Sequence, residues 1–124
     1  MSQSNYNASN DTQGVVEAST DLSSSIFSIV KEGSTGVVLC GAGERPVGVL
    51  VNNPKAGAIA KIIGVGPGAK VICGGVITKG DMVATGASGV AVSRTNQNYI
   101  IGFAKESGVL NDIIEIDVHI FHIA

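Results

Sequence analysis

The sequence is a series of short β-branched and apolar runs, separated at nearly every step by glycine, proline, asparagine or aspartate. From Val15 onward, no stretch keeps apolar residues at the i, i+3, i+4 and i+7 spacing of an amphipathic helix. Glycine supplies 17 of the 124 residues, which is roughly twice its average share. We therefore expect little helix and many short strands joined by tight turns.

Each run that we predict to be a strand is bounded by such turn residues. The predicted strands cover residues 26–31, 36–40, 47–52, 59–65, 70–73, 82–85, 89–93, 100–104 and 113–123. Strands joined by such short connections pair antiparallel. The sequence therefore predicts an all-β fold, either a compact antiparallel β-sandwich or a β-barrel.

The first residues differ from the rest of the chain in composition. Residues 1–14 are mostly Ser, Asn, Gln and Asp, and Tyr6 is their only large side chain. So polar a segment buries too little apolar area to offset the entropy lost on ordering, unless a partner orders it. We expect an extended N-terminal arm over residues 1–20 and a single β domain over residues 21–124, since a chain of this length has room for one domain.

Charge and targeting signals exclude several partners. The net charge is −2 and the eight basic residues are scattered, so neither nucleic acid nor an anionic membrane is an expected partner. The first residues lack the basic start and the apolar stretch of a secretory signal. The most apolar region, residues 58–77, is interrupted by Lys61, Pro67 and Lys70, which excludes a membrane-spanning helix. These features indicate synthesis in a reducing cytoplasm.

Cys40 and Cys73 lie within apolar segments and not at the spacing of metal ligands. Unpaired cysteine packs as a small hydrophobic residue. We expect two buried free thiols; a disulfide and a reactive thiol are the alternatives.

The glycine-rich stretch 64–68 superficially resembles a dinucleotide-binding loop. It lacks the final glycine of that motif, and the residues that follow are typical of a strand and not of the helix that a phosphate needs. Pro67 between two glycines favours a tight β-turn.

The last predicted strand has the clearest alternation of apolar and polar residues. Ile114, Ile116, Val118 and Ile120 share one face, and Glu115, Asp117 and His119 share the other. The polar row could ligate a metal, with His122 as the nearest further imidazole. A closed metal site usually draws ligands from several elements, so we expect a solvated or subunit-contact face and no metal.

Catalysis has few residues to depend on. The two histidines are within the last six residues, and no Gly-x-Ser-x-Gly pentapeptide is present. We therefore expect no enzymatic activity and no cofactor. The turn around Lys79-Gly80-Asp81 leaves one alternative, a lipoyl- or biotinyl-type carrier domain, although the Met-Lys or Asp-Lys dipeptide of such carriers does not occur.

The order of several short motifs is more specific than any one of them. A Pro-Val-Gly-Val-Leu run (residues 46–50) leads into Asn-Pro-x-x-Gly (residues 53–57), and Gly-Gly-x-Ile-x-x-Gly-Asp follows at residues 74–81. Gly-x-Ala-Val (residues 89–92) and Ile-Gly-x-Ala (residues 101–104) complete the order. Across residues 22–120 this arrangement resembles the capsid decoration, or cement, proteins of tailed bacteriophages.

The resemblance implies a compact, non-catalytic β-fold that assembles on the outer face of an icosahedral head. It implies a homo-oligomer, with a trimer favoured over a dimer, that clamps neighbouring subunits of the major capsid (coat) protein and stabilises the expanded capsid. The polar arm, which many family members lack, would reach across adjacent subunits. The residues expected to contact coat protein or another subunit are Tyr6, Asn7, Arg45, Pro46, Asn52 and Asn53.

Overall fold

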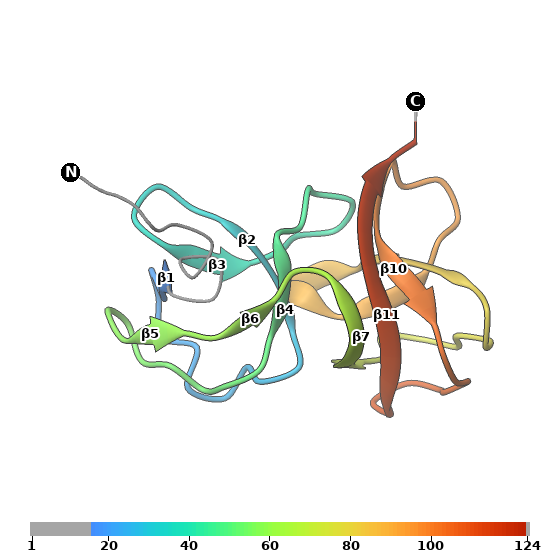
Figure 1. Ribbon diagram of the computed structural model, residues 1–124, viewed down its shortest axis with the longest axis horizontal. Helices are drawn as coiled ribbons and strands as arrows, with labels where there is room; N and C mark the ends of the chain where they lie inside the picture. The colour runs from blue at the N-terminus through green and yellow to red at the C-terminus, as the bar shows by residue number, and fades with distance from the viewer. Residues whose placement is uncertain (1–15, 124) are drawn as a thin grey trace.

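The structure, a computed structural model, describes residues 16–123. This part of the chain is built from short strands and a single-turn 3-10 helix, η2 (Ala87–Gly89) (Figure 1). The strands are β1 (Val16–Glu17), β2 (Ile29–Glu32), β3 (Val37–Leu39), β4 (Gly48–Leu50), β5 (Ile59–Ala60), β6 (Ile62–Ile63), β7 (Gly66–Ile72), β8 (Met82–Thr85), β9 (Ala91–Ser93), β10 (Tyr99–Ala104) and β11 (Ile113–His122). The expected scarcity of helix is confirmed for these residues. They contain no helix with the length and apolarity needed to cross a bilayer.

The strands form three antiparallel sheets. The main sheet has the order β7-β11-β10-β8-β9, the middle sheet has the order β3-β2-β4-β6, and the outer ribbon is β1-β5. Parallel contacts are limited, in this range, to the isolated bridges Ala18↔Val37 and Cys73↔Ala91. None of the three strand orders closes on itself, so the all-β prediction is confirmed as a sandwich and not as a closed barrel.

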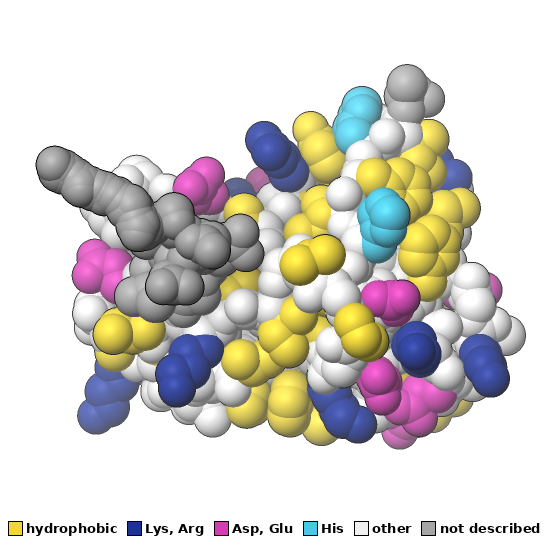
Figure 2. All heavy atoms as spheres, viewed as in Figure 1, with side chains coloured by type: hydrophobic (Ala, Val, Ile, Leu, Met, Phe, Trp, Pro, Cys, Tyr) yellow, Lys and Arg dark blue, Asp and Glu magenta, His cyan; other side chains and the backbone are white. Residues whose placement is uncertain are grey.

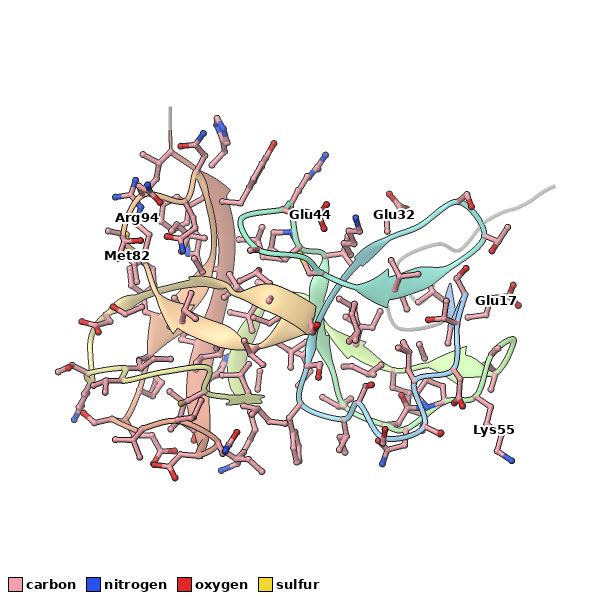
Figure 3. All side chains as sticks on the ribbon, turned by 180° about the vertical axis from the view of Figure 1, so that it is seen from behind. Glu17, Glu32, Glu44, Lys55, Met82 and Arg94 are labelled. Atoms are coloured by element: carbon pink, nitrogen blue, oxygen red, sulfur yellow. The ribbon has the colours of Figure 1, made fainter. Side chains whose placement is uncertain are left out.

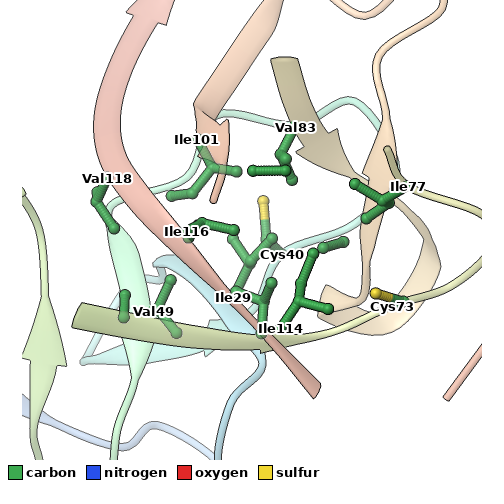
Figure 4. Packing of buried hydrophobic residues seen from close by; sticks show 14 residues of the cluster. Ile29, Cys40, Val49, Cys73, Ile77, Val83, Ile101, Ile114, Ile116 and Val118 are labelled. Carbon is green, nitrogen blue, oxygen red and sulfur yellow. The ribbon is translucent and has the colours of Figure 1, made fainter. Parts of the chain in front are cut away.

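The middle sheet separates two hydrophobic cores. Ile29 and Val49, which face each other across β2 and β4, pack with the main sheet in the main core (Figure 4). The next residue on each strand, Val30 or Leu50, packs on the opposite side in a second core. All four are fully buried, because successive side chains of a strand point to opposite faces.

Three layers therefore follow one another along the molecule. Figure 1 shows the main sheet at one end, the outer ribbon at the other, and β2 and β4 between them. The same order is visible from behind in Figure 3, where Met82 and Arg94 mark the main-sheet end and Glu17 and Lys55 mark the outer-ribbon end.

The start of the folded body precedes the expected end of the arm. Val16 and Glu17 pair with Ala60 and Ile59 as β1 and β5. Ala18 is buried in the second core, and the Ser19 amide donates to the Val37 carbonyl at 2.9 Å. Within the expected arm, residues 16–19 thus contribute to sheet pairing and to a core. Residues 1–15 lie outside the described residues.

The turn predicted at Gly66-Pro67-Gly68 is wrong, because these residues begin strand β7. The pairing of β7 with β11 shifts register between Ile116 and Val118, which is the mark of a β-bulge. Gly66 and Gly68 both have φ of 94°, a value that glycine adopts without a steric cost. Because β7 is an edge strand, Pro67 can lack an N–H there without breaking the sheet. The glycines and the proline that favour a turn in the sequence thus form the start of a bulged edge strand.

Other strand boundaries also differ from the predicted ones, and two of these differences have a clear local cause. β2 begins at Ile29 and not at residue 26, because Phe27 has φ of 72° and its amide donates to the Leu50 carbonyl at 2.8 Å. The run 59–65 divides into β5 and β6 at Lys61, whose amide donates to Asn52 Oδ1 at 2.9 Å.

Candidate contact surfaces

The predicted contact residues occupy three places. Tyr6 and Asn7 lie outside the described residues. Arg45 and Pro46 are in the connection between β3 and β4, where Arg45 is exposed and Pro46 is buried. Of that pair, Arg45 is therefore the side chain available to a partner.

Hydrogen bonds hold the connection beside Arg45 in place. Glu44 Oε1 accepts from the Gly41 amide at 2.7 Å and pairs with Lys31 Nζ at 2.8 Å (Figure 3 shows Glu44). The Gly43 amide donates to the Thr85 carbonyl at 3.1 Å and ties this connection to the main sheet. The Lys31 ammonium, and then the Gly41 amide, lower the pKa of Glu44, and the Glu44 carboxylate raises the pKa of Lys31. The Glu44 charge is thus matched within the protein.

Asn52 and Asn53 have structural partners inside the protein. Asn52 ties the end of β4 to the segment that contains β5, since its Nδ2 donates to the Ile59 carbonyl at 3.0 Å and its Oδ1 accepts from the Lys61 amide. Asn53 Oδ1 accepts from the Ile26 amide at 2.9 Å. Through these bonds both side chains anchor the β4–β5 connection. That Asn52 and Asn53 also contact a partner stays a prediction.

A surface that the sequence analysis missed is an aromatic patch on β10 and β11. Five of the chain's seven aromatic and imidazole rings lie on these two strands, in two groups: Tyr99 with His122, and Phe103 with His119 and Phe121. Ring centroids are 4.8 Å apart for Tyr99 and His122, 5.5 Å for His119 and Phe121, and 6.0 Å for Phe103 and Phe121. Figure 2 shows both histidines, in cyan, beside hydrophobic side chains. The spacing of 119 and 121 signals a shared strand face, but the ring partners on β10 depend on a bulged register that the sequence does not reveal.

The aromatic patch meets Arg45 at a surface hollow of about 310 Å³, which we call the terminal hollow. Its lining residues are Arg45, Tyr99, Ile120, Phe121 and His122. A residue predicted to contact a partner therefore lies next to rings from two strands of the main sheet.

A larger groove of about 640 Å³ lies at the other end of the molecule. Its apolar lining comes from β1, β3 and β6 and from the residues just before β4 and β7: Val16, Val37, Ile62, Val47 and Val65. Val65 is 73% exposed. The groove carries one titratable side chain, Glu32, among the residues that line it in the described range, so its chemistry is that of an apolar contact.

The groups weighed for chemistry lie apart from one another. Cys40 and Cys73 are free and buried in the main core, as predicted (Figure 4). Burial raises the pKa of both thiols and so disfavours the nucleophilic thiolate. Among residues 16–123, no three His, Cys, Asp or Glu side chains come together as a metal site.

Lys79, the residue of the carrier alternative, is exposed in a tight turn. The Asp81 amide donates to the Thr78 carbonyl, and Asp81 Oδ2 accepts from the Thr78 amide, each at 2.9 Å. The Lys79 amide donates to Ser107 Oγ at 2.8 Å. These bonds hold the backbone of the turn and leave the lysine side chain in solvent.

Comparison with known proteins finds a solved structure with a similar fold. No protein-family model and no curated protein matches the sequence. Among solved structures, the N base of the head fiber gp8.5 of bacteriophage phi29 matches with a TM-score of 0.68 and covers 85% of this chain and 91% of its own. The chain has the fold of a phage head-fiber base. At 18% identity the likeness establishes the fold, and the function needs its own argument.

Proposed function

We propose that the chain is a structural virion protein of a tailed bacteriophage that binds the outside of the icosahedral head. The observation that carries the proposal is the fold shared with a head-fiber base over 85% of this chain. The motif order at residues 46–57, 74–81 and 89–104 points independently to head-surface proteins.

In this proposal the protein acts by binding alone. It clamps neighbouring subunits of the coat protein and has a higher affinity for the expanded shell than for free coat protein. Differential affinity, repeated at every site on the head, shifts the equilibrium towards the assembled shell. The buried thiols and the surface hollows fit a protein that works through contacts.

The assembly that we propose is a homotrimer placed where three coat subunits meet, since a symmetric oligomer matches a symmetric site. Three copies held together bind more tightly than one, because the second and third contacts become intramolecular. The exposed Arg45 connection and the N-terminal arm are its proposed coat contacts.

The direct test is to image particles of the source phage that are labelled with an antibody against this chain. We expect label on the exterior of intact heads, and gel densitometry should give a fixed ratio to coat protein. Particles made without the gene should lose their DNA at a lower temperature, and adding back the purified protein should restore the wild-type value. Label confined to particle interiors or to unassembled protein would contradict the proposal.

The alternative function, a lipoyl- or biotinyl-type carrier domain, is checked on protein taken from the same phage particles. Intact mass spectrometry of the protein from its native source should give the mass of the polypeptide. A lipoyl or biotinyl increment on Lys79 would instead support the carrier function.

A further inference from the structure

The terminal hollow contains a positive charge that no carboxylate of residues 16–123 pairs with. Arg45 is exposed at its rim. The neighbouring carboxylate of Glu44 is bound to Lys31 at 2.8 Å, and Glu32 lines an adjacent hollow without forming an ion pair with Arg45. Within residues 16–123, Arg45 forms no ion pair.

The rest of the hollow is lined by Tyr99, Ile120, Phe121 and the exposed imidazole of His122. Tyr99, Ile120 and Phe121 are each half-buried, so part of each side chain is accessible. The hollow continues onto the aromatic patch, where Phe103 is 37% exposed. Aromatic side chains beside an arginine are the residue types that dominate binding energy at protein interfaces.

We infer that the terminal hollow binds an acidic peptide segment of the coat protein. A carboxylate of that segment pairs with the Arg45 guanidinium, and an adjacent apolar side chain packs against Tyr99 and Phe121. A guanidinium can bind a carboxylate with two parallel hydrogen bonds. This inference rests on the proposed function and specifies the partner's chemistry at one site.

The charge around the hollow favours an acidic peptide over nucleic acid. A nucleic-acid site needs a row of cations to follow the phosphates, whereas Arg45 is the single Lys or Arg that lines this hollow. One cation bordered by half-buried aromatic rings instead matches one carboxylate next to an apolar side chain.

The test measures binding of purified protein to particles that lack it, at low and high salt. Arg45→Gln should weaken binding about tenfold, as expected for the loss of one charge-assisted contact. Arg45→Lys should retain more of the binding than Arg45→Gln, because it keeps the charge. The difference in particle affinity between the wild type and Arg45→Gln should become smaller at high salt, because salt screens exposed charges.

The matched control is Lys105→Gln, which removes the same charge from an exposed site. Lys105 follows the last residue of β10, whereas Tyr99, which lines the hollow, is the first residue of that strand. It should bind as the wild type does. Phe121→Ala tests the apolar half of the hollow and should also weaken binding to the particles. Thermal denaturation checks that this variant folds. If it does not fold, the Arg45→Gln variant alone decides the test.

The possible results separate the inference from the function on which it rests. If wild-type protein binds the particles and Arg45→Gln binds equally well, the inference is overturned and the proposed function stands. If wild-type protein does not bind particles at all, the proposed function itself fails. If Arg45→Gln or Phe121→Ala changes the oligomeric state in sedimentation velocity, the hollow is a contact between copies of this chain, and the inference is wrong.

Discussion

Lys31 and Glu44 form an ion pair that lines the hollow next to the terminal hollow, and Arg45 lines both hollows. Their pKa values move in opposite directions, because each charge stabilises the other. The stability that Glu44 contributes is present above its unfolded-state pKa and is lost as pH falls through its lowered folded-state pKa. The contribution of Lys31 is present below its unfolded-state pKa and is lost as pH rises through its raised one.

We predict that Lys31→Met raises the pKa of Glu44 towards its ordinary value. An NMR titration of the side-chain carboxyl carbons would measure the change, with Asp21 as the internal reference. The pKa of Asp21 is lowered mainly by hydrogen bonds from Ser23, so it should stay constant. A Glu44 titration unaffected by Lys31→Met would show that the Gly41 amide alone sets its pKa.

Single residues differ in how far the sequence predicts them. Apolar neighbours indicate that Cys40 and Cys73 are buried, because burial follows from local composition. The bonds of Asn52 and Asn53 reach residues 59, 61 and 26. Such contacts depend on how separate segments meet, and a local pattern carries no information about them.

Among the elements, β10 contains a position where two strands approach too closely for any side chain. A Cβ on Gly102 would lie 2.1 Å from the Asp117 carbonyl oxygen of β11. Gly102 also pairs with Val83 of β8, so neither neighbouring strand can move away freely. The backbone spacing of the main sheet at this point therefore requires glycine.

We predict that Gly102→Ala lowers the free energy of unfolding by about 2–3 kcal/mol, the upper part of the usual range for overpacking. Urea denaturation would measure the loss. Gly75→Ala is the control, because nothing lies within 4 Å of a Cβ there, and its effect should stay within about 0.5 kcal/mol. Equal stability of the two variants would mean that the strands separate at little cost.

The elements themselves are predicted better than their irregularities. Alternation in the last strand correctly indicates that Ile114, Ile116 and Val118 are buried. The bulge in β7 is missed because glycine and proline favour a turn when the neighbouring strand is unknown. The aromatic patch is missed for the same reason, since its rings come together only through the β10–β11 pairing.

At the scale of the molecule, β2 and β4 belong to both cores. Leu50 is fully buried in the second core, and the preceding Val49 is fully buried in the main core. Neither core can lose these strands without exposing apolar residues of the other. The three-layer order was not predictable from the sequence, because consecutive apolar residues such as these are typical of a buried strand but do not say which layers cover it.

We predict that unfolding is one cooperative transition and that Leu50→Ala lowers the stability of the whole molecule by about 3 kcal/mol. Scanning calorimetry should give one peak, with equal calorimetric and van't Hoff enthalpies. Two separate peaks in the variant would show that the second core melts independently of the main core.

Deleting residues 1–14 tests the proposed arm. The deletion leaves β1 and its pairing with β5 in place, so we expect a folded oligomer that occupies heads poorly. Circular dichroism and sedimentation velocity check the fold and assembly, and gel densitometry of purified particles measures occupancy. Full occupancy by the shortened protein would show that the arm is dispensable.

β11 lies between β7 and β10 in the main sheet and supplies Ile114, Ile116 and Val118 to the main core. It is also the last of these strands to leave the ribosome. A nascent chain that has already exposed β7 and β10 must wait for β11 before either can join the other, because no direct pairing links them. Completion of the main sheet is thus a late event in biosynthesis, and until then chaperones would encounter two unpaired strand edges.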